Sequence, residues 1–233
     1  MTLCFVIAAA GLAALIWYVK EKLAGFTVKE LMLKTLVSCL FIGTALAAQA
    51  VSGSRFGYFV LFGLVCGLMG DVWLDLKFVY PDDNDIYSFA GFKSFLIGHI
   101  FYIGGEIYLY ADFSKPLYLI VPVILSVAVG FAVVLLAPVM KLEYGKFKKI
   151  SMIYAMFLFG TVFFSGSLAL MYGFSDTALN LMFIGGILFA ASDLVLSGTY
   201  FGTGKDRPVD IILNYATYYP AQFVIAFSLL FAK

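Results

Sequence analysis

Three ionisable side chains stand inside long apolar stretches of the sequence, where acids and bases can do chemistry within a membrane. They are Asp71, Asp193 and His99, the only histidine of the chain. An unpaired charge near the middle of a bilayer costs about 2.5 to 3.5 kcal/mol on the more lenient insertion scale, so such residues need a reason to be kept. We predict that they form a catalytic site, in preference to the alternative that they only hold helices together through buried hydrogen bonds.

The three residues are expected at similar depths in the bilayer. Asp71 and Asp193 each lie about fifteen residues into apolar segments that run toward the same side, which places them roughly 22 Å from one edge of the bilayer. His99 lies about eleven residues into a segment of the opposite direction, roughly 16 Å from the other edge. Three helices should therefore converge on one polar site in the cytoplasmic half of the membrane.

Other polar residues on these segments are expected to bind a substrate. Asp75 shares a helix face with Asp71, because four residues separate them. It is a borderline case, because it stands near the end of its segment, where charges are commonly solvated. The other residues expected to bind substrate are Tyr102, Asn214, Tyr218, Tyr219 and Gln222.

Several further charges are expected to have no part in the chemistry. Glu106 is expected to reach an interface by snorkelling. The charges expected to be solvated at or beyond a helix end are Lys77, Asp82, Asp83 and Asp85.

The composition indicates that the chain lies in a lipid bilayer. Of the 233 residues, 63% are hydrophobic and only 12% are charged, and the mean hydropathy is +1.01, whereas a soluble domain has roughly 25% charged residues. The net charge of +1 offers no basic patch for nucleic acid. Cys4, Cys39 and Cys66 lie in apolar segments without CxxC spacing, so neither a disulfide framework nor a thiolate zinc site is indicated.

The apolar segments predict an all-α, polytopic membrane protein that forms a single transmembrane domain over residues 1–233. About eight runs approach the 20 residues that a helix needs to cross a bilayer. The first is expected to be a retained helix rather than a signal peptide, because no Lys or Arg precedes it and no small-residue cleavage site ends it. The predicted spans are residues 2–19, 31–50, 56–76, 88–110, 117–137, 150–172, 178–198 and 209–231.

The distribution of cations predicts the orientation, because Lys and Arg of short loops stay on the cytoplasmic side. The first, third, fifth and seventh connectors, with the adjoining helix ends, hold most of the 15 cations. The other side has Arg55, Lys115 and Lys233. We therefore expect both termini outside the cytoplasm, in the inner (cytoplasmic) membrane of a bacterium. The cations expected on the cytoplasmic side are Lys20, Lys22, Lys29, Lys34, Lys77, Lys93, Lys141, Lys146, Lys148, Lys149, Lys205 and Arg207.

Short motifs over essentially the whole chain resemble those of one family, the YhhN family, which includes the animal transmembrane lysoplasmalogenases. Their order and spacing carry the resemblance, since each motif is weak alone. The family's usual topology also has eight spans. The motifs are Gly70-Asp71-Val72-Trp73-Leu74, Phe89-Ala90-Gly91 with the following Phe95–Tyr102 segment, Ser192-Asp193, and Tyr218-Tyr219-Pro220-Ala221-Gln222.

The resemblance implies hydrolysis of the vinyl ether bond of lysoplasmalogens to a fatty aldehyde and glycerophosphoethanolamine or glycerophosphocholine. This reaction begins with protonation of the alkene carbon, so it needs an acid, an anion to stabilise the oxocarbenium ion, and a positioned water. Asp71 and Asp193 suit the first two roles, because two carboxylates in an apolar cavity oppose each other's ionisation. Which of the two is the acid stays open. His99, oriented by Tyr102, is suited to relay a proton or to bind the phosphate of the head group.

No cofactor is expected for this chemistry. A catalytic zinc site normally uses three protein ligands, often several histidines, and this chain has one histidine. An intramembrane aspartyl protease is disfavoured, because Leu68 stands where the first glycine of its Gly-x-Gly-Asp motif would fall. The expected partners are a lysophospholipid substrate and membrane lipid, with a monomer favoured.

A membrane carrier is the main alternative from another class of function. The segments around Asp71 and Asp193 read alike and are four spans apart, which indicates a 4+4 parallel repeat. Transporters with such repeats place a protonatable site at the repeat interface.

Overall fold

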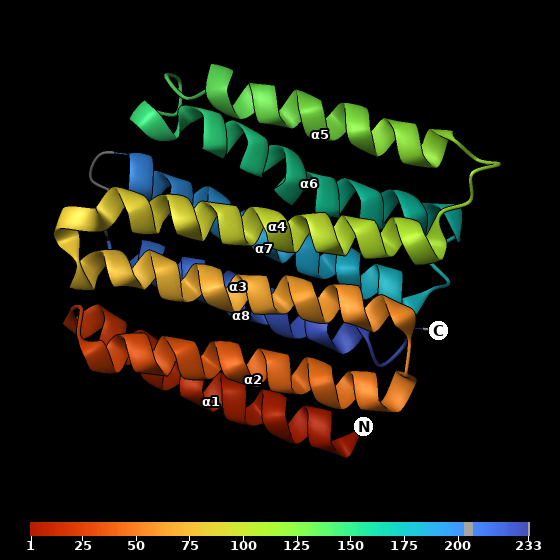
Figure 1. Ribbon diagram of the computed structural model, residues 1–233, viewed down its shortest axis with the longest axis horizontal. Helices are drawn as coiled ribbons and strands as arrows, with labels where there is room; N and C mark the ends of the chain where they lie inside the picture. The colour runs from red at the N-terminus through yellow and green to blue at the C-terminus, as the bar shows by residue number, and fades with distance from the viewer. Residues whose placement is uncertain (203–206, 233) are drawn as a thin grey trace.

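The computed structural model is a bundle of eight long helices, described over residues 1–202 and 207–232. Helices α1 and α2 lie along one flank and α5 and α6 along the other, with α3, α4, α7 and α8 between them (Figure 1). Two short 3-10 helices, η1 (Pro81–Asp83) and η2 (Gly145–Phe147), lie in connectors. The long helices are α1 (Thr2–Ala24), α2 (Val28–Ser52), α3 (Arg55–Val79), α4 (Asn84–Tyr110), α5 (Leu117–Leu135), α6 (Lys148–Met171), α7 (Thr177–Phe201) and α8 (Pro208–Ser228).

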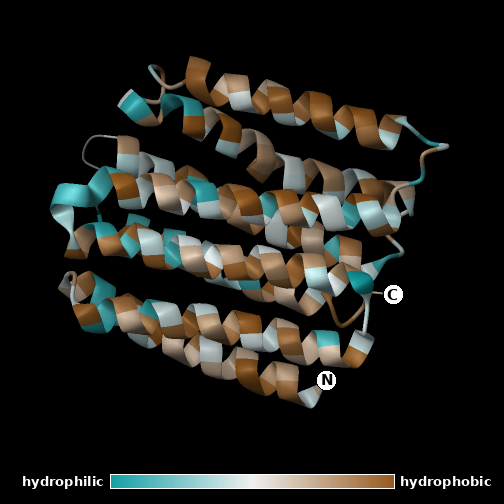
Figure 2. Cartoon of the chain, in the orientation of Figure 1, coloured by the Kyte–Doolittle hydropathy of each residue, from teal (hydrophilic) through white to brown (hydrophobic). Residues whose placement is uncertain are grey.

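The all-α membrane fold predicted from the sequence is confirmed. Seven of the helices are long and apolar enough to cross a membrane, and hydrophilic residues concentrate near the ends of the bundle (Figure 2). Helix α8 is not among the seven. Its polar residues Asn214 and Gln222 are turned into the bundle, where they are 7% and 0% exposed, so α8 belongs to the same membrane-embedded body.

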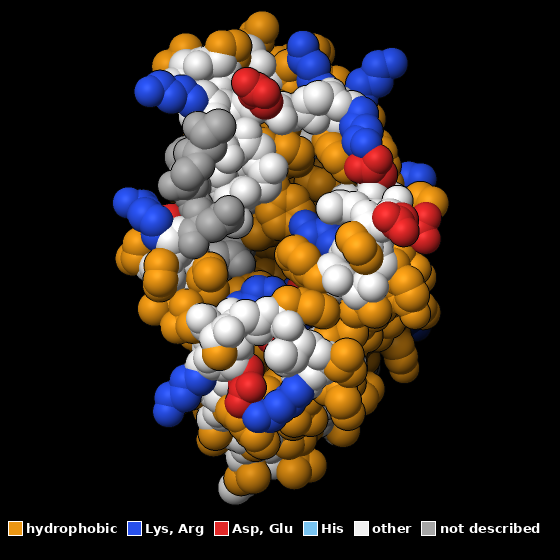
Figure 3. Space-filling view, turned by 90° about the vertical axis from the view of Figure 1, so that its left-hand side faces the viewer, with side chains coloured by type: hydrophobic (Ala, Val, Ile, Leu, Met, Phe, Trp, Pro, Cys, Tyr) orange, Lys and Arg blue, Asp and Glu red, His pale blue; other side chains and the backbone are white. Residues whose placement is uncertain are grey.

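One end of the bundle carries the connectors α1–α2, α3–α4 and α5–α6 together with the end of α7 and the start of α8, and the N-terminus and the end of α8 lie at the opposite end (Figure 1). The connector end is the one on which the sequence concentrates its cations, and Lys and Arg side chains surround a hollow there (Figure 3). Lys205 and Lys233 lie outside the described residues. This end is called the basic end below.

The two halves of the chain pack in the same pattern, which supports the predicted 4+4 repeat. Helix α2 contacts α3 and α8, and α6 in the same way contacts α7 and α4. Asp71 and Asp193 each lie sixteen residues after the first residue of α3 and α7, and Gly63 and Gly185 each lie eight residues after it. A Cβ atom at either glycine would meet a side chain of the next helix, at 2.1 Å and 2.6 Å respectively. Corresponding glycines thus set the close approach of α4 to α3 and of α8 to α7.

Two adjacent glycines of α4 test this packing. A Cβ atom at Gly105 would lie 2.7 Å from the Cβ atom of Phe59, whereas one at Gly104 would meet nothing within 4 Å. Because a Cβ atom cannot rotate away, we predict that Gly105→Ala lowers the stability by about 1 to 3 kcal/mol. Stability is measured as the temperature at which half of the protein in detergent is no longer monodisperse. Gly104→Ala is the matched control, and an equal loss in both variants would contradict the packing.

Candidate active site

A cavity of about 380 Å³ is lined by both Asp71 and Asp193. Its outer part is formed at the basic end by Lys22, Phe78 and Tyr144. They belong to the end of α1, the end of α3 and the α5–α6 connector, respectively. The hollow in Figure 3 lies on the same face. The cavity therefore joins the two carboxylates to the basic end of the bundle.

Asp71 is held by hydroxyl donors and by a lysine. Ser38 of α2 donates a hydrogen bond to its Oδ2 atom at 2.7 Å, and Tyr218 of α8 donates to the same atom at 2.8 Å. Lys34 Nζ lies 3.8 Å from Oδ1. The side chain of Asp71 is buried, so these groups replace the water that an exposed carboxylate would have.

Lys34 also binds Asp75. Its Nζ atom donates to Asp75 Oδ1 at 2.9 Å, and the two residues are only 4% and 2% exposed. Lys34 is therefore buried inside the bundle, although it lies near the start of α2, and Asp75 is not solvated at the end of its helix. Both line the cavity. Lys34 ties α2 to α3 from within the membrane-spanning part of the bundle.

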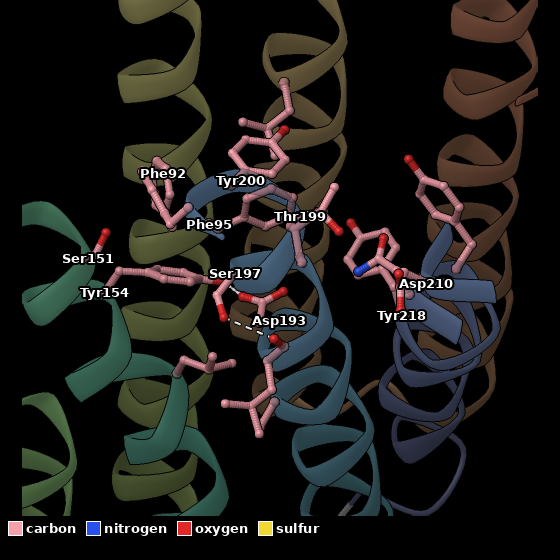
Figure 4. A pocket seen from close by; sticks show the side chains of 18 of the residues that line it. Phe92, Phe95, Ser151, Tyr154, Asp193, Ser197, Thr199, Tyr200, Asp210 and Tyr218 are labelled. Carbon is pink, nitrogen blue, oxygen red and sulfur yellow. Dashed lines mark hydrogen bonds between the residues drawn. The ribbon is translucent and has the colours of Figure 1, made fainter. Parts of the chain in front are cut away.

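Asp193 has a different environment. Tyr154 of α6 donates a hydrogen bond to its Oδ2 atom, and Ser192 Oγ lies 3.4 Å from Oδ1. None of the salt bridges among the described residues includes Asp193. Figure 4 shows Asp193 and Tyr154 together in the cavity. The two aspartates thus occupy equivalent helix positions, but only Asp71 has a cation beside it.

His99 lies behind the cavity wall rather than in the cavity, so the expectation that it shares the cavity with the aspartates is wrong. Its ring is 5.8 Å from the Tyr154 ring and 4.8 Å from the Phe189 ring, and it is not a lining residue. Thr161 Oγ1 lies 3.0 Å from Nδ1 and uses its own hydrogen on the carbonyl of Phe157. Nδ1 and Thr161 thus form a hydrogen bond that orients the ring. His99 supports Tyr154, which in turn holds Asp193.

The residues expected to bind substrate divide into those that line the cavity and those that lie behind it. Asn214 and Tyr218 line it, and the Asn214 amide donates to the Ser192 carbonyl at 2.9 Å. Gln222 donates to Tyr218 Oη at 3.0 Å from behind the wall. Tyr102 and Tyr219 are buried but do not line the cavity. Gln222 thus orients a ligand of Asp71 rather than facing a substrate.

Two charges expected at an interface or in solvent are buried. Glu106 is 0% exposed and accepts a hydrogen bond from Ser165 of α6, so it does not snorkel. Lys77 is 8% exposed, and its Nζ atom lies 3.4 Å from the centre of the Tyr200 ring. The ammonium group thus makes a cation–π contact with the face of this ring.

Three residues of the site were missed because their partners lie far apart in the chain. They are Lys34, Ser38 and Tyr154, whose bonds to the aspartates span 41, 33 and 39 residues. Lys34 alone carried a usable signal, since it stands inside the predicted span 31–50 and a lysine there needs an anion. No cluster of three or more His, Cys, Asp or Glu side chains placed to hold a metal occurs in the part of the chain that the structure describes.

Comparison with known proteins gives one match. The family model described as the YhhN family matches residues 29–229, a range that includes every residue lining the cavity except Lys22 and Phe26. No curated protein and no solved structure matches the chain.

Removal of the lysine tests the ionic contact. We predict that Lys34→Met lowers the stability by about 3 to 5 kcal/mol, because it leaves Asp71 and Asp75 as uncompensated buried charges. The double variant Lys34→Met/Asp75→Asn should recover much of the loss, since it removes a charge of each sign. The measurement is the thermal midpoint in detergent, with the exposed Lys20→Met as control. Equal midpoints for Lys34→Met and Lys20→Met would show that the buried ion pair does not form.

Proposed function

Because the chain belongs to the YhhN family, as its match over residues 29–229 shows, we propose that it is an intramembrane hydrolase that cleaves the vinyl ether bond of lysoplasmalogens. The products are a fatty aldehyde and glycerophosphoethanolamine or glycerophosphocholine. The observation that carries this proposal is the presence of Asp71 and Asp193 in one largely apolar cavity with different partners. Family membership supports a hydrolase of membrane lipids, and the two carboxylates supply the acid and the anion that this reaction needs.

The partners of the two carboxylates assign their roles. Asp71 lies next to Lys34, and its Oδ2 atom accepts two hydrogen bonds, which suits an anion that stabilises a developing positive charge. Asp193 has no salt bridge among the described residues and faces the cavity, which suits an acid that donates a proton. Asp193 therefore protonates the alkene carbon, and Asp71 stabilises the oxocarbenium ion.

The remaining steps add water and break the carbon–oxygen bond. Water attacks the oxocarbenium carbon and gives a hemiacetal, with its released proton taken by a carboxylate of the site. Collapse of the hemiacetal frees the glycerol hydroxyl and leaves the oxygen of the water in the aldehyde. The reaction consumes one water and no net proton, so Asp71 and Asp193 return to their starting states. Tyr154 and Tyr218 hold the two carboxylates in place throughout.

A carrier is the second candidate, favoured by the matching pattern of the two halves of the bundle. Carriers built from repeats place their ionisable site between the repeats, where Asp71 and Asp193 lie. Uptake of a lysolipid into proteoliposomes, without release of aldehyde and with dependence on a proton gradient, would favour the carrier over the hydrolase.

The site leads to a prediction about the carboxylates. Asp71→Asn and Asp193→Asn should each lower aldehyde release from alkenyl lysophosphatidylethanolamine by at least about a hundredfold, since each removes a group that takes part in proton transfer or charge stabilisation. Purified protein in detergent, with a chelator present, is the sample. Asp82→Asn, an exposed aspartate in η1, is the control and should retain activity. Full activity in either site variant would remove that carboxylate from the mechanism.

The distribution of cations also leads to a prediction about orientation. We propose that the basic end faces the cytoplasm, so that lysolipid enters from the cytoplasmic leaflet and both termini lie on the other side. A reporter that is active only outside the cytoplasm should be active when fused after Lys233 and inactive when inserted between Pro81 and Asp83. The opposite pattern would reverse the proposed orientation.

A further inference from the structure

The cavity has charged residues on one side and none on the other. Its charged lining residues come from α1, α2, α3, α7 and α8. In the fully described stretch formed by α5, α6 and their connector, none of the lining residues is charged. Because α1 with α2 and α5 with α6 lie on opposite flanks of the bundle (Figure 1), the polarity changes across the cavity.

The polar side is called the polar arm and consists of Lys22, Lys34, Asp75 and Asp210. The apolar residues of the other side are called the apolar arm, and Tyr144, Ser151 and Tyr154 line the cavity beside them. The apolar arm consists of Val133, Met140, Ala155, Leu158, Phe159 and Leu194. Asp71 and Asp193 lie between the two arms, on α3 and α7 of the central layer.

The apolar arm has a fixed wall and an open margin. The connector that follows α5 is attached to the end of α7, where the Glu143 N–H donates to the carbonyl of Phe201 at 2.8 Å. Val133 packs into the small cluster that this attachment creates. Leu194, at 51% exposed, lies at the margin of the arm. The apolar arm can thus bind a flexible hydrocarbon chain along a wall that the protein's own contacts hold in place.

We propose that the apolar arm binds the hydrocarbon chain of the lysolipid, while the polar arm takes its zwitterionic head group. This inference rests on the proposed function and adds to it the direction in which the substrate lies. When an amphipathic ligand binds in this orientation, its charged head group does not contact the apolar arm. Its hydrocarbon chain does not contact the buried Lys34–Asp75 pair. It also places the bond between head group and chain, the vinyl ether, at the level of Asp71 and Asp193. Residues of α5 and α6 then determine which chain lengths are accepted.

Neighbouring valines of α5 give a matched test. Val133 lines the cavity and Val134 does not, although both are half-buried. Val133→Trp should raise KM for a long-chain alkenyl lysophosphatidylethanolamine by about tenfold and leave kcat/KM for a short-chain homologue within about twofold, because only the long chain needs the filled space. Val134→Trp should leave both substrates unchanged. Equal effects of Val133→Trp on both chain lengths, or equal effects of the two variants, would overturn the proposal.

A second measurement uses the wild-type protein and does not depend on turnover. A non-hydrolysable alkyl lysophosphatidylethanolamine with a photoreactive group at the chain end should label residues 133–140 and 155–159. Labelling of α1 or α2 instead would overturn the direction of the chain. Absence of aldehyde release from the wild type, with labelling of residues 133–140 and 155–159, would reject the vinyl ether reaction while supporting the apolar arm.

Discussion

The structure depends on the free-energy cost of placing a charged side chain in hydrocarbon. A charged group inside the bundle needs a partner that offsets this cost. Lys34 meets this constraint by lying between Asp71 and Asp75, at 3.8 Å and 2.9 Å from their carboxylate oxygens. The contact joins α2 to α3, and Tyr218 extends it to α8. Three helices are thus held together by the same interactions that keep Asp71 as an anion in the proposed reaction. Stability and chemistry therefore share one set of residues.

The repeat explains how two equivalent aspartates can differ. Lys34 lies six residues after the first residue of α2, and Tyr154 lies six residues after the first residue of α6. The same place in the two halves thus holds a lysine beside Asp71 and a phenol beside Asp193. In the proposed reaction, this difference and the Ser38 and Tyr218 donors of Asp71 distinguish the anion from the acid. The two halves also divide the cavity, because the first contributes the lysines of the polar arm and the second contributes all of the apolar arm.

The sequence predicted the parts of this arrangement that depend on residues near one another in the chain. Apolar runs predicted the helices, and the aspartates were identified because a charge inside such a run is exceptional. Their partners could not be predicted, since Tyr218 meets Asp71 across 147 residues and only the packing of α8 on α3 brings them together. His99 does not line the cavity, because helical rise predicts how far along a helix a residue lies, whereas the direction of its side chain follows from packing. Glu106 was misplaced for the same reason, as Ser165 belongs to another helix.

Isotope labelling of the products tests most directly the claim that the protein hydrolyses the vinyl ether bond by protonation of carbon. The purified protein would act on alkenyl lysophosphatidylethanolamine in deuterated, 18O-enriched water, with immediate reduction of the aldehyde. Protonation of the alkene carbon should give a fatty alcohol with one solvent deuterium on the carbon next to the former carbonyl, and a glycerophosphoethanolamine without solvent 18O. Solvent 18O in the glycerophosphoethanolamine, or absence of deuterium from that carbon, would contradict the account.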